Sequence, residues 1–291
     1  MNLKMKSSPR ALILTLVSLL GAASACATVV FTDNFDAYAT GSQTSNANWK
    51  NPTVTTGQTI TIENDSTNYF DASATNKYLS LVSGVTGTAP AAATTVFGAQ
   101  KVATMTLSFD FRQPAVANAE GTGWMVRILS QNAGSTSNAN TAFAFFIQNG
   151  ALYAASNEDT VNIGAKITDF SLETTHSISV IFNYTATILT YGDNDQYSLA
   201  AGKMDVWLDG SLVGTALAGS GGKRADGGNK QTYVNIVDFT AKPNFIGSLY
   251  VDNLTIDNTA IAPAAVPEPA ALTLLVGAVI LAFATLRRWR N

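Results

Sequence analysis

The stretch from Val102 to Arg112 reads Val-Ala-Thr-Met-Thr-Leu-Ser-Phe-Asp-Phe-Arg, and it is the part of the chain that decides the fold. From position 104 onward, polar and apolar side chains alternate. Successive side chains of a strand point to opposite faces of a sheet, so this alternation predicts a strand with one face in a hydrophobic core. The apolar positions are Met105, Leu107, Phe109 and Phe111, and the polar ones are Thr104, Thr106, Ser108 and Asp110.

Turn signals between apolar runs extend this pattern along the chain. Asn149-Gly150 and Asp209-Gly210 each separate two such runs, and these dipeptides favour the type I′ turn of a two-residue β-hairpin. No stretch between residues 28 and 257 has the 3.6-residue period of an amphipathic helix. About a dozen short strands without helices predict an all-β fold, a two-sheet antiparallel jelly-roll sandwich over residues 28–257.

The first 27 residues have the order of a secretory signal peptide. Lys4, Lys6 and Arg10 precede an apolar run, and Ala25-Cys26-Ala27 fits a small-residue cleavage site. Cleavage after Ala27 would remove the only cysteine, so the ectodomain would have no disulfide and no thiol nucleophile. The alternative is that Cys26 belongs to a loose lipobox and is lipidated.

The other end of the chain has an apolar run with a basic end. Residues 270–286 contain no charge, and Arg287, Arg288 and Arg290 follow them. A helix of that length is roughly 25 Å long, just short of a typical hydrocarbon core. Basic residues favour the cytoplasmic side, so we expect one transmembrane helix over 270–286, a basic cytoplasmic tail over 287–291 and a linker over 258–265 outside. A buried core helix is the alternative.

The motif before this helix is Val266-Pro267-Glu268-Pro269. With the apolar helix and the arginines, residues 266–291 resemble the PEP-CTERM sorting signal of Gram-negative bacteria that make exopolysaccharide. The resemblance implies that Pro267, Glu268 and Pro269 are recognised by an exosortase-type membrane protease, and that the inner membrane holds the chain only transiently before it reaches the cell surface or the extracellular matrix. An ordinary single-span anchor is the alternative.

Three further motifs resemble concanavalin A-like, or laminin-G-like, jelly-roll domains. They are Asp33-Asn34-Phe35-Asp36, Val206-Trp207-Leu208-Asp209-Gly210 and Tyr250-Val251-Asp252-Asn253-Leu254. In such folds the first and last strands pair, which would bring Asp33 and Asp36 near Asp252. Calcium takes six to eight oxygen ligands, so these three carboxylates are candidate ligands of a structural Ca²⁺. The alternative is that they only form turns.

Charge and aromatic content bear on the ligand. Of the 17 basic residues six lie in the two ends, and of the 20 acidic residues only Glu268 does, so the ectodomain has a net charge of −8. This charge argues against nucleic acid as a partner. Sugar sites use aromatic faces together with polar side chains, which makes Trp49, Tyr191 and Tyr197 candidate ligand-binding residues, with Trp49 expected to be exposed in a polar loop. The alternative is that these rings belong to the core.

Enzymatic signatures are weak in this sequence. The ectodomain has four isolated glutamates and one histidine, His176, which is too few for a zinc triad, and no nucleophile-elbow motif is present. No catalytic residue is predicted, and His176, at the start of a strand, is expected to be exposed there. We therefore expect an exported, non-enzymatic protein of the cell envelope or matrix with exopolysaccharide as its candidate ligand. The alternative is a secreted glycan-active hydrolase with an unrecognised carboxylate pair. The four glutamates are Glu63, Glu120, Glu158 and Glu173.

Overall fold

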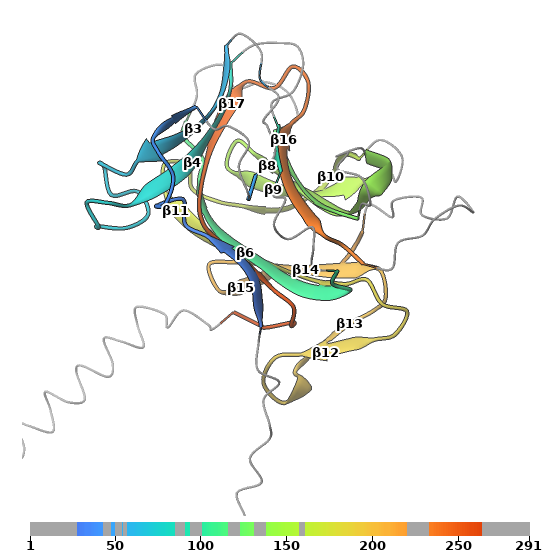
Figure 1. The fold of residues 1–291 in the computed structure, drawn as a ribbon. Coiled ribbons are helices and arrows are strands. Elements are labelled where there is room, and N and C mark those ends of the chain that lie inside the picture. Colours follow the sequence, from blue (N-terminus) through green and yellow to red (C-terminus); the bar gives the residue numbers. More distant parts are fainter. Residues whose placement is uncertain are drawn as a thin grey trace, which may run out of the picture.

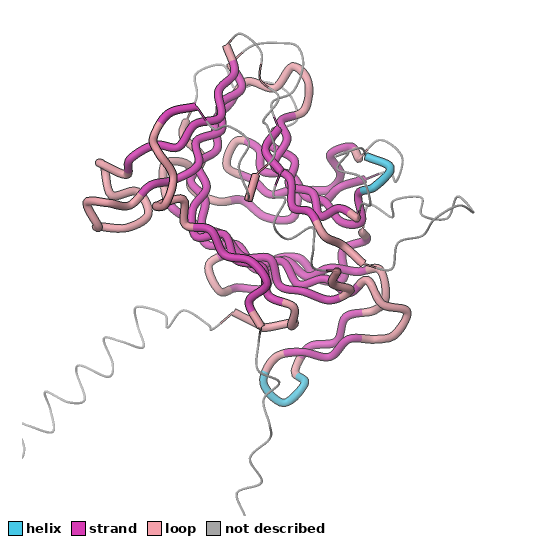
Figure 2. Tube along the Cα trace, in the orientation of Figure 1, coloured by secondary structure: helices cyan, strands magenta, loops and turns pink. Residues whose placement is uncertain are grey.

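Antiparallel strands provide nearly all the regular structure in the part of the chain that the structure describes (Figure 2). The computed structural model describes residues 28–42, 48–49, 54, 57–84, 91–93, 101–115, 123–130, 138–156, 161–219 and 233–263. Within these ranges the helical elements are two 3-10 turns, Asn138–Asn140 and Asp193–Asp195. No helix among the described residues is long and apolar enough to cross a membrane, and the predicted signal peptide and transmembrane helix lie outside them.

The strands form two main sheets and one small hairpin (Figure 1). The larger sheet has nine strands in the order β15-β14-β11-β6-β17-β4-β3-β2, with β1 beside β17; the smaller has six in the order β10-β9-β8-β7-β16-β5. The larger sheet contains β1 (Val29–Asp33), β2 (Gly41–Ser42), β3 (Gln58–Asn64), β4 (Lys77–Ser83), β6 (Thr104–Arg112), β11 (Thr175–Asn183), β14 (Lys203–Leu208), β15 (Ser211–Ala218) and β17 (Gly247–Asp257). The smaller contains β5 (Ala91–Ala93), β7 (Trp124–Leu129), β8 (Thr141–Gln148), β9 (Ala151–Ser156), β10 (Asn162–Asp169) and β16 (Ile236–Ala241). The hairpin is β12 (Leu189–Tyr191) with β13 (Tyr197–Leu199).

The predicted alternation in the stretch that decides the fold is confirmed. Strand β6 lies in the middle of the larger sheet between β11 and β17, and its apolar side chains belong to one core cluster with those of the smaller sheet. Phe109 of β6 packs edge-to-face on Phe239 of β16, with 5.3 Å between ring centroids. Burying a phenylalanine side chain contributes about 1.5–3 kcal/mol, so this inner face holds the two sheets together.

Both predicted hairpins are present. Asn149 and Gly150, with φ of 45° and 78°, connect β8 to β9, and Asp209 and Gly210, with φ of 49° and 75°, connect β14 to β15. A type I′ turn needs positive φ at both central residues, which asparagine, aspartate and glycine adopt more readily than other residues. The local sequence therefore fixes the register of four strands.

The first and last strands pair, as the resemblance implied. β1 lies along the second half of β17, with Asp33 opposite Leu254, while β4 pairs with the first half. At the junction β17 has a bulge opposite β6, and Asn253 has φ of 52°. Because of the extra residue, Val251 and Leu254 both reach the core, and Asp252 and Thr255 both take the opposite face.

Strand β10 and the hairpin of β12 and β13 gave no periodic signal in the sequence. Strand β10 pairs with β9 at the edge of the smaller sheet, and none of its side chains is fully buried. A half-exposed edge strand does not need strict alternation, so Asn162–Asp169 gave no periodic signal. The hairpin of β12 and β13 has three residues in each strand, which is too short for a periodic signal.

The residues after β17 fold back onto the larger sheet. We call residues 258–263 the exit strap. The Thr106 hydroxyl donates to the Thr259 carbonyl at 2.7 Å and accepts from the Ile261 amide at 2.9 Å. Ala260 and Ala262 pack on the apolar cluster beneath β12 and β13. The first six residues of the predicted linker therefore lie against the domain, next to Thr28 at its start.

Candidate functional site

The outer face of the larger sheet, opposite the core, has a polar path along its central strands. All but one of the side chains in this path are polar, the exception being Ile181. Alternate rows of a sheet are about 6.6 Å apart, so the path is about 20 Å long. From one end to the other, its rows across β17, β6 and β11 are Tyr250–Arg112–Thr175, Asp252–Asp110–Ser177, Thr255–Ser108–Ser179 and Asp257–Thr106–Ile181.

Three tyrosines form a cluster at the first of these rows, and we call Tyr69, Tyr78 and Tyr250 the tyrosine cluster. The ring centroids of Tyr78 and Tyr250 are 4.9 Å apart, and Tyr69 stacks on Tyr250 at 5.9 Å. None of the three belongs to the main core cluster. Tyr69 and Tyr250 are half-buried, and Tyr78 is 7% exposed. The face thus offers a partly exposed aromatic surface.

A loop between β3 and β4 brings Tyr69 onto this face. The buried carboxylate of Asp65 accepts the backbone amides of Tyr69 at 2.7 Å and Phe70 at 2.8 Å, and the side-chain amide of Asn76 at 3.3 Å. Burial alone would raise the pKa of Asp65, but the amide donors of Phe70, Tyr69 and Asp71 outweigh it and the pKa falls below its usual value. The ionised carboxylate therefore fixes the loop.

The tyrosine hydroxyls are available as donors. Burial, followed by the neighbouring tyrosines and carboxylates, raises the pKa of Tyr78 and of Tyr250 above the usual value, so both stay protonated at neutral pH. Among the described residues, no hydrogen bond engages the hydroxyls of the three tyrosines. A ligand with acceptor oxygens could therefore bind them without displacing a protein partner.

A charged pair borders the cluster. The Arg112 guanidinium lies 4.4 Å from the centroid of the Tyr69 ring, and its Nη2 is 2.6 Å from Glu173 Oε2. Glu173 Oε1 accepts the Ala115 amide at 2.7 Å, so both carboxylate oxygens already have protein donors. The side chain of Glu173 is about half exposed, and the pair thus forms a polar rim beside the rings.

The structure places the predicted ligand-binding aromatics elsewhere. The expectation that Trp49 is exposed is wrong: its side chain is fully buried, and its indole N–H donates to Asp33 at 2.8 Å. Tyr191 is 3% exposed and donates its hydroxyl to Asp205, while the half-buried Tyr197 stacks on Tyr191 and lies edge-on to Trp207. Hydrogen-bonding partners let Trp49 and Tyr191 take core positions.

The tyrosine cluster was missed because its members alternate with core residues. Tyr78 precedes Leu79, and Tyr250 lies between Leu249 and Val251, all of which are buried. Strand periodicity could have found them, since an aromatic residue on the polar side of an alternating strand is expected to face water.

The three predicted calcium ligands lie around the junction of β1, β4 and β17. Asp33 already receives hydrogen bonds from Phe35, Tyr38 and Trp49, so both of its carboxylate oxygens are occupied. Asp36 accepts the Lys77 amide at 2.9 Å, and Asp252 accepts from Asn76 at 3.1 Å. In the described ranges, no three acidic, histidine or cysteine side chains form a metal-ligand cluster.

Asp252 differs from the other two carboxylates. It is fully buried, and its burial, with the nearby charges of Asp110 and Asp36, raises its pKa to about 7 despite hydrogen bonds from Asn76 and Asn253. A neighbouring cation would offset the free-energy cost of burying the ionised carboxylate of Asp252. All three carboxylates have a protein donor at each oxygen, so hydrogen bonding does not distinguish them, and calcium stays a prediction.

The predicted sorting residues lie beyond the part of the chain that the structure describes. They are Val266, Pro267, Glu268, Pro269, Arg287, Arg288 and Arg290.

Comparison with known proteins supports the fold. No protein-family model and no curated protein matches the sequence. Cellulose induced protein Cip1 superposes with a TM-score of 0.52 at 12% identity, over 80% of this chain and 100% of that one. An endo-β-1,4-glucuronan lyase from the fungus Trichoderma reesei gives 0.46 at 12% identity, over 82% and 100%. A sialidase gives 0.49 at 9% identity over 79% of this chain, which spans only 18% of the sialidase. The likeness to Cip1 is one of fold, and it agrees with the predicted antiparallel jelly-roll architecture.

Proposed function

We propose that this chain is a non-enzymatic protein of the cell envelope or extracellular matrix that binds exopolysaccharide through the tyrosine cluster. The observation that carries the proposal is the position of three tyrosine rings on the outer face of a sheet, separate from the core. Rings of this kind stack on the C–H face of a sugar, while the tyrosine hydroxyls, Arg112 and Glu173 offer hydrogen bonds to its hydroxyls.

The delivery of the protein is part of the same proposal. A signal peptide over residues 1–27 would export the chain, and residues 266–291 would be recognised by an exosortase-type protease while the inner membrane holds them. The exit strap ends at residue 263, so three residues, 264–266, separate it from Pro267 of the predicted recognition motif. Mass spectrometry of the mature protein tests it: recovery of a peptide containing Leu286 and the arginines would indicate a permanent anchor instead.

Glycan binding is tested by removing one ring at a time. With exopolysaccharide from a producing bacterium as probe, Tyr250→Ala and Tyr69→Ala should each weaken binding about tenfold, because stacking on an aromatic ring contributes roughly 1 kcal/mol or more. Tyr153→Ala is the matched control, since Tyr153 is a half-buried tyrosine packed against the separate cluster of the smaller sheet. Equal binding by all variants would contradict the proposal.

The alternative, a glycan-active hydrolase, has one observation in its favour. The charges of Glu173 and Glu63 both act on the Tyr250 hydroxyl, so two carboxylates lie near the proposed sugar site. Against it, both oxygens of Glu173 are held by Arg112 and Ala115, so Glu173 is not free to act as one carboxylate of a catalytic pair. New reducing ends released by the wild type and abolished in Glu63→Gln would favour the hydrolase.

A further inference from the structure

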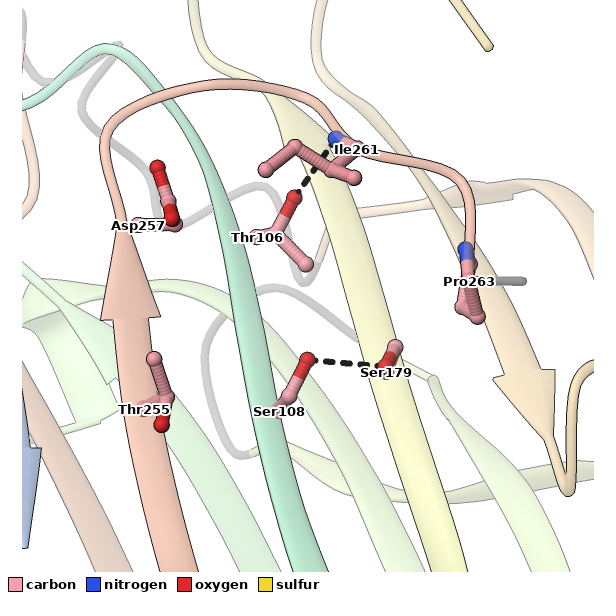
Figure 3. Close-up of a pocket in the computed structure, with 7 residues that line it drawn as sticks. All are labelled: Thr106, Ser108, Ser179, Thr255, Asp257, Ile261 and Pro263. Carbon is pink, nitrogen blue, oxygen red and sulfur yellow. Dashed lines mark hydrogen bonds between the residues drawn. The ribbon is translucent and has the colours of Figure 1, made fainter. Parts of the chain in front are cut away.

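A cavity lies at the opposite end of the polar path, between the larger sheet and the exit strap (Figure 3). Its volume is about 140 Å³, and it is partly open to solvent. Hydroxyl groups from β6, β11 and β17 line its floor, and Ile261 and Pro263 of the strap line its side. This cavity is separate from the tyrosine cluster, two to three rows or about 13–20 Å away along β17 and β6.

The floor of the cavity is fixed by sheet register. Thr255, Ser108 and Ser179 occupy one row across the three strands, and the Ser108 and Ser179 hydroxyls are hydrogen-bonded to each other at 2.8 Å. The bulge in β17 allows Thr255 to face the cavity. Strand register holds the backbone of these residues, so the hydroxyls are already in place before a ligand arrives.

The exit strap is held over this floor from two sides. Thr106 bonds the strap at Thr259 and Ile261, and Asp257 Oδ1 accepts the Thr259 hydroxyl at 2.8 Å. The residues that line the cavity have two groups without a hydrogen bond to any described residue, namely the Thr255 hydroxyl and Asp257 Oδ2. They are therefore available to a ligand.

The size of the cavity and the side chains that line it determine which class of ligand it fits. An apolar cavity of about 150 Å³ holds benzene, so this volume admits one six-membered ring, with its outer substituents left in water. Hydroxyls and a carboxylate bind the hydroxyls of such a ring, while Ile261 and Pro263 contact its C–H face. None of the residues that line the cavity is basic, and the Asp257 carboxylate would repel an acidic sugar.

We propose that this cavity is a second sugar site, which binds a single neutral hexopyranose unit. The proposal goes beyond the function assigned to the tyrosine cluster and does not depend on it. The two sites share one face, so a polysaccharide chain could occupy both.

The test uses the purified full-length chain with D-glucose, D-galactose and D-mannose as probes and D-glucuronate as the acidic comparison. We expect at least one neutral sugar to bind with a Kd of roughly 1–10 mM by ligand-observed NMR, as is reasonable for so small a contact. D-Glucuronate should bind at least about tenfold more weakly. Thr255→Val keeps the side-chain shape but removes the free hydroxyl, and should weaken the neutral sugar about tenfold.

Matched variants separate this site from the tyrosine cluster and from misfolding. Thr59→Val makes the same change on β3 of the same sheet, away from the cavity, and should leave binding unchanged. Tyr153→Ala, on the smaller sheet and outside both proposed sites, should also leave monosaccharide binding unchanged. The proposal is overturned if no neutral hexose binds, if Thr255→Val binds like the wild type, or if Tyr250→Ala alone abolishes binding. The last result would place the sugar at the tyrosine cluster.

Discussion

The two outer faces of the sandwich differ in what they show to solvent. On the larger sheet, the outer face has a polar path with half-buried tyrosines at one end and a cavity at the other. On the smaller sheet, Met125, Ala144 and Phe146 of the outer face are buried with Val161 in a second apolar cluster. Every side chain of β7 is buried, on both faces of the strand.

This difference explains where function can reside and what a sequence can reveal. A strand with one face in water alternates, as β6 does, whereas a strand covered on both faces reads as a mostly apolar run, as β8 does and as β7 does apart from Arg127. Only the alternating strands show which of their residues are available to a ligand. We therefore place the proposed binding on the larger sheet, whose outer face is polar and partly exposed, whereas the outer face of the smaller sheet is largely buried.

The largest expected effect comes from the covered face. Arg127 and Asp238 form a buried ion pair there, and Arg127 also donates to Asn138 and Thr240. Arg127→Met leaves the Asp238 charge buried without its partner and should destabilise the protein by about 3–5 kcal/mol, measured by urea unfolding. Adding Asp238→Leu should recover much of that loss. If Arg127→Met alone is as stable as the wild type, this face is not closed to water.

The next prediction compares how much side-chain packing on each outer face contributes to stability. Phe146 is fully buried in the cluster of the smaller sheet, so Phe146→Ala should cost about 3–4 kcal/mol. Tyr250→Ala on the other outer face should cost about half as much, since its ring is only half-buried. Thermal unfolding of the two variants compares them directly, and equal losses would contradict the distinction between the faces.

The third prediction concerns pH and the loop that holds Tyr69. The pKa of Asp65 is lowered in the folded protein, so its contribution to stability is present above its unfolded value of about 4 and is lost as pH falls through the folded value. Asp65→Asn should cost about 1–2 kcal/mol at pH 7. The gap from the wild type should close below pH 4 or so in urea unfolding. A gap independent of pH would mean that the charge of Asp65 does not hold the loop.

The smallest effect is expected from calcium at the junction of β1, β4 and β17. Millimolar Ca²⁺ at pH 8 should raise the melting temperature by about 2–4 °C, equivalent to about 1 kcal/mol, through Asp33, Asp36 and Asp252. At pH 5.5 the effect should be weaker, because protons compete with the metal for carboxylates. Asp252→Asn should remove the stabilisation, and the absence of any calcium effect on the wild type would end this prediction.

The features that were predicted correctly are those that depend on residues close together in the sequence. The alternation of β6 and the positive-φ turns at Asn149-Gly150 and Asp209-Gly210 are confirmed because each depends on neighbouring residues alone. Trp49 and His176, by contrast, were expected to be exposed. His176 is buried between Asp209 and the Ser171 carbonyl, 2.7 and 2.9 Å from its ring nitrogens. Such burial depends on partners that the local pattern does not show, and so does the cavity. For the tyrosine cluster, periodicity could place Tyr78 and Tyr250 on the outer face, but it could not show that they meet.

Strand β17 connects the two proposed sites to the chain's exit. It starts next to the tyrosine cluster at Tyr250, passes the cavity at Thr255 and leads directly into the exit strap. A pull between a polymer held at Tyr250 and a tail fixed beyond Pro263 would act along this strand. Its hydrogen bonds to β6, β4 and β1 would then be sheared together rather than opened one after another. The sandwich would thus resist tension along the line that joins the proposed ligand site to the predicted tail.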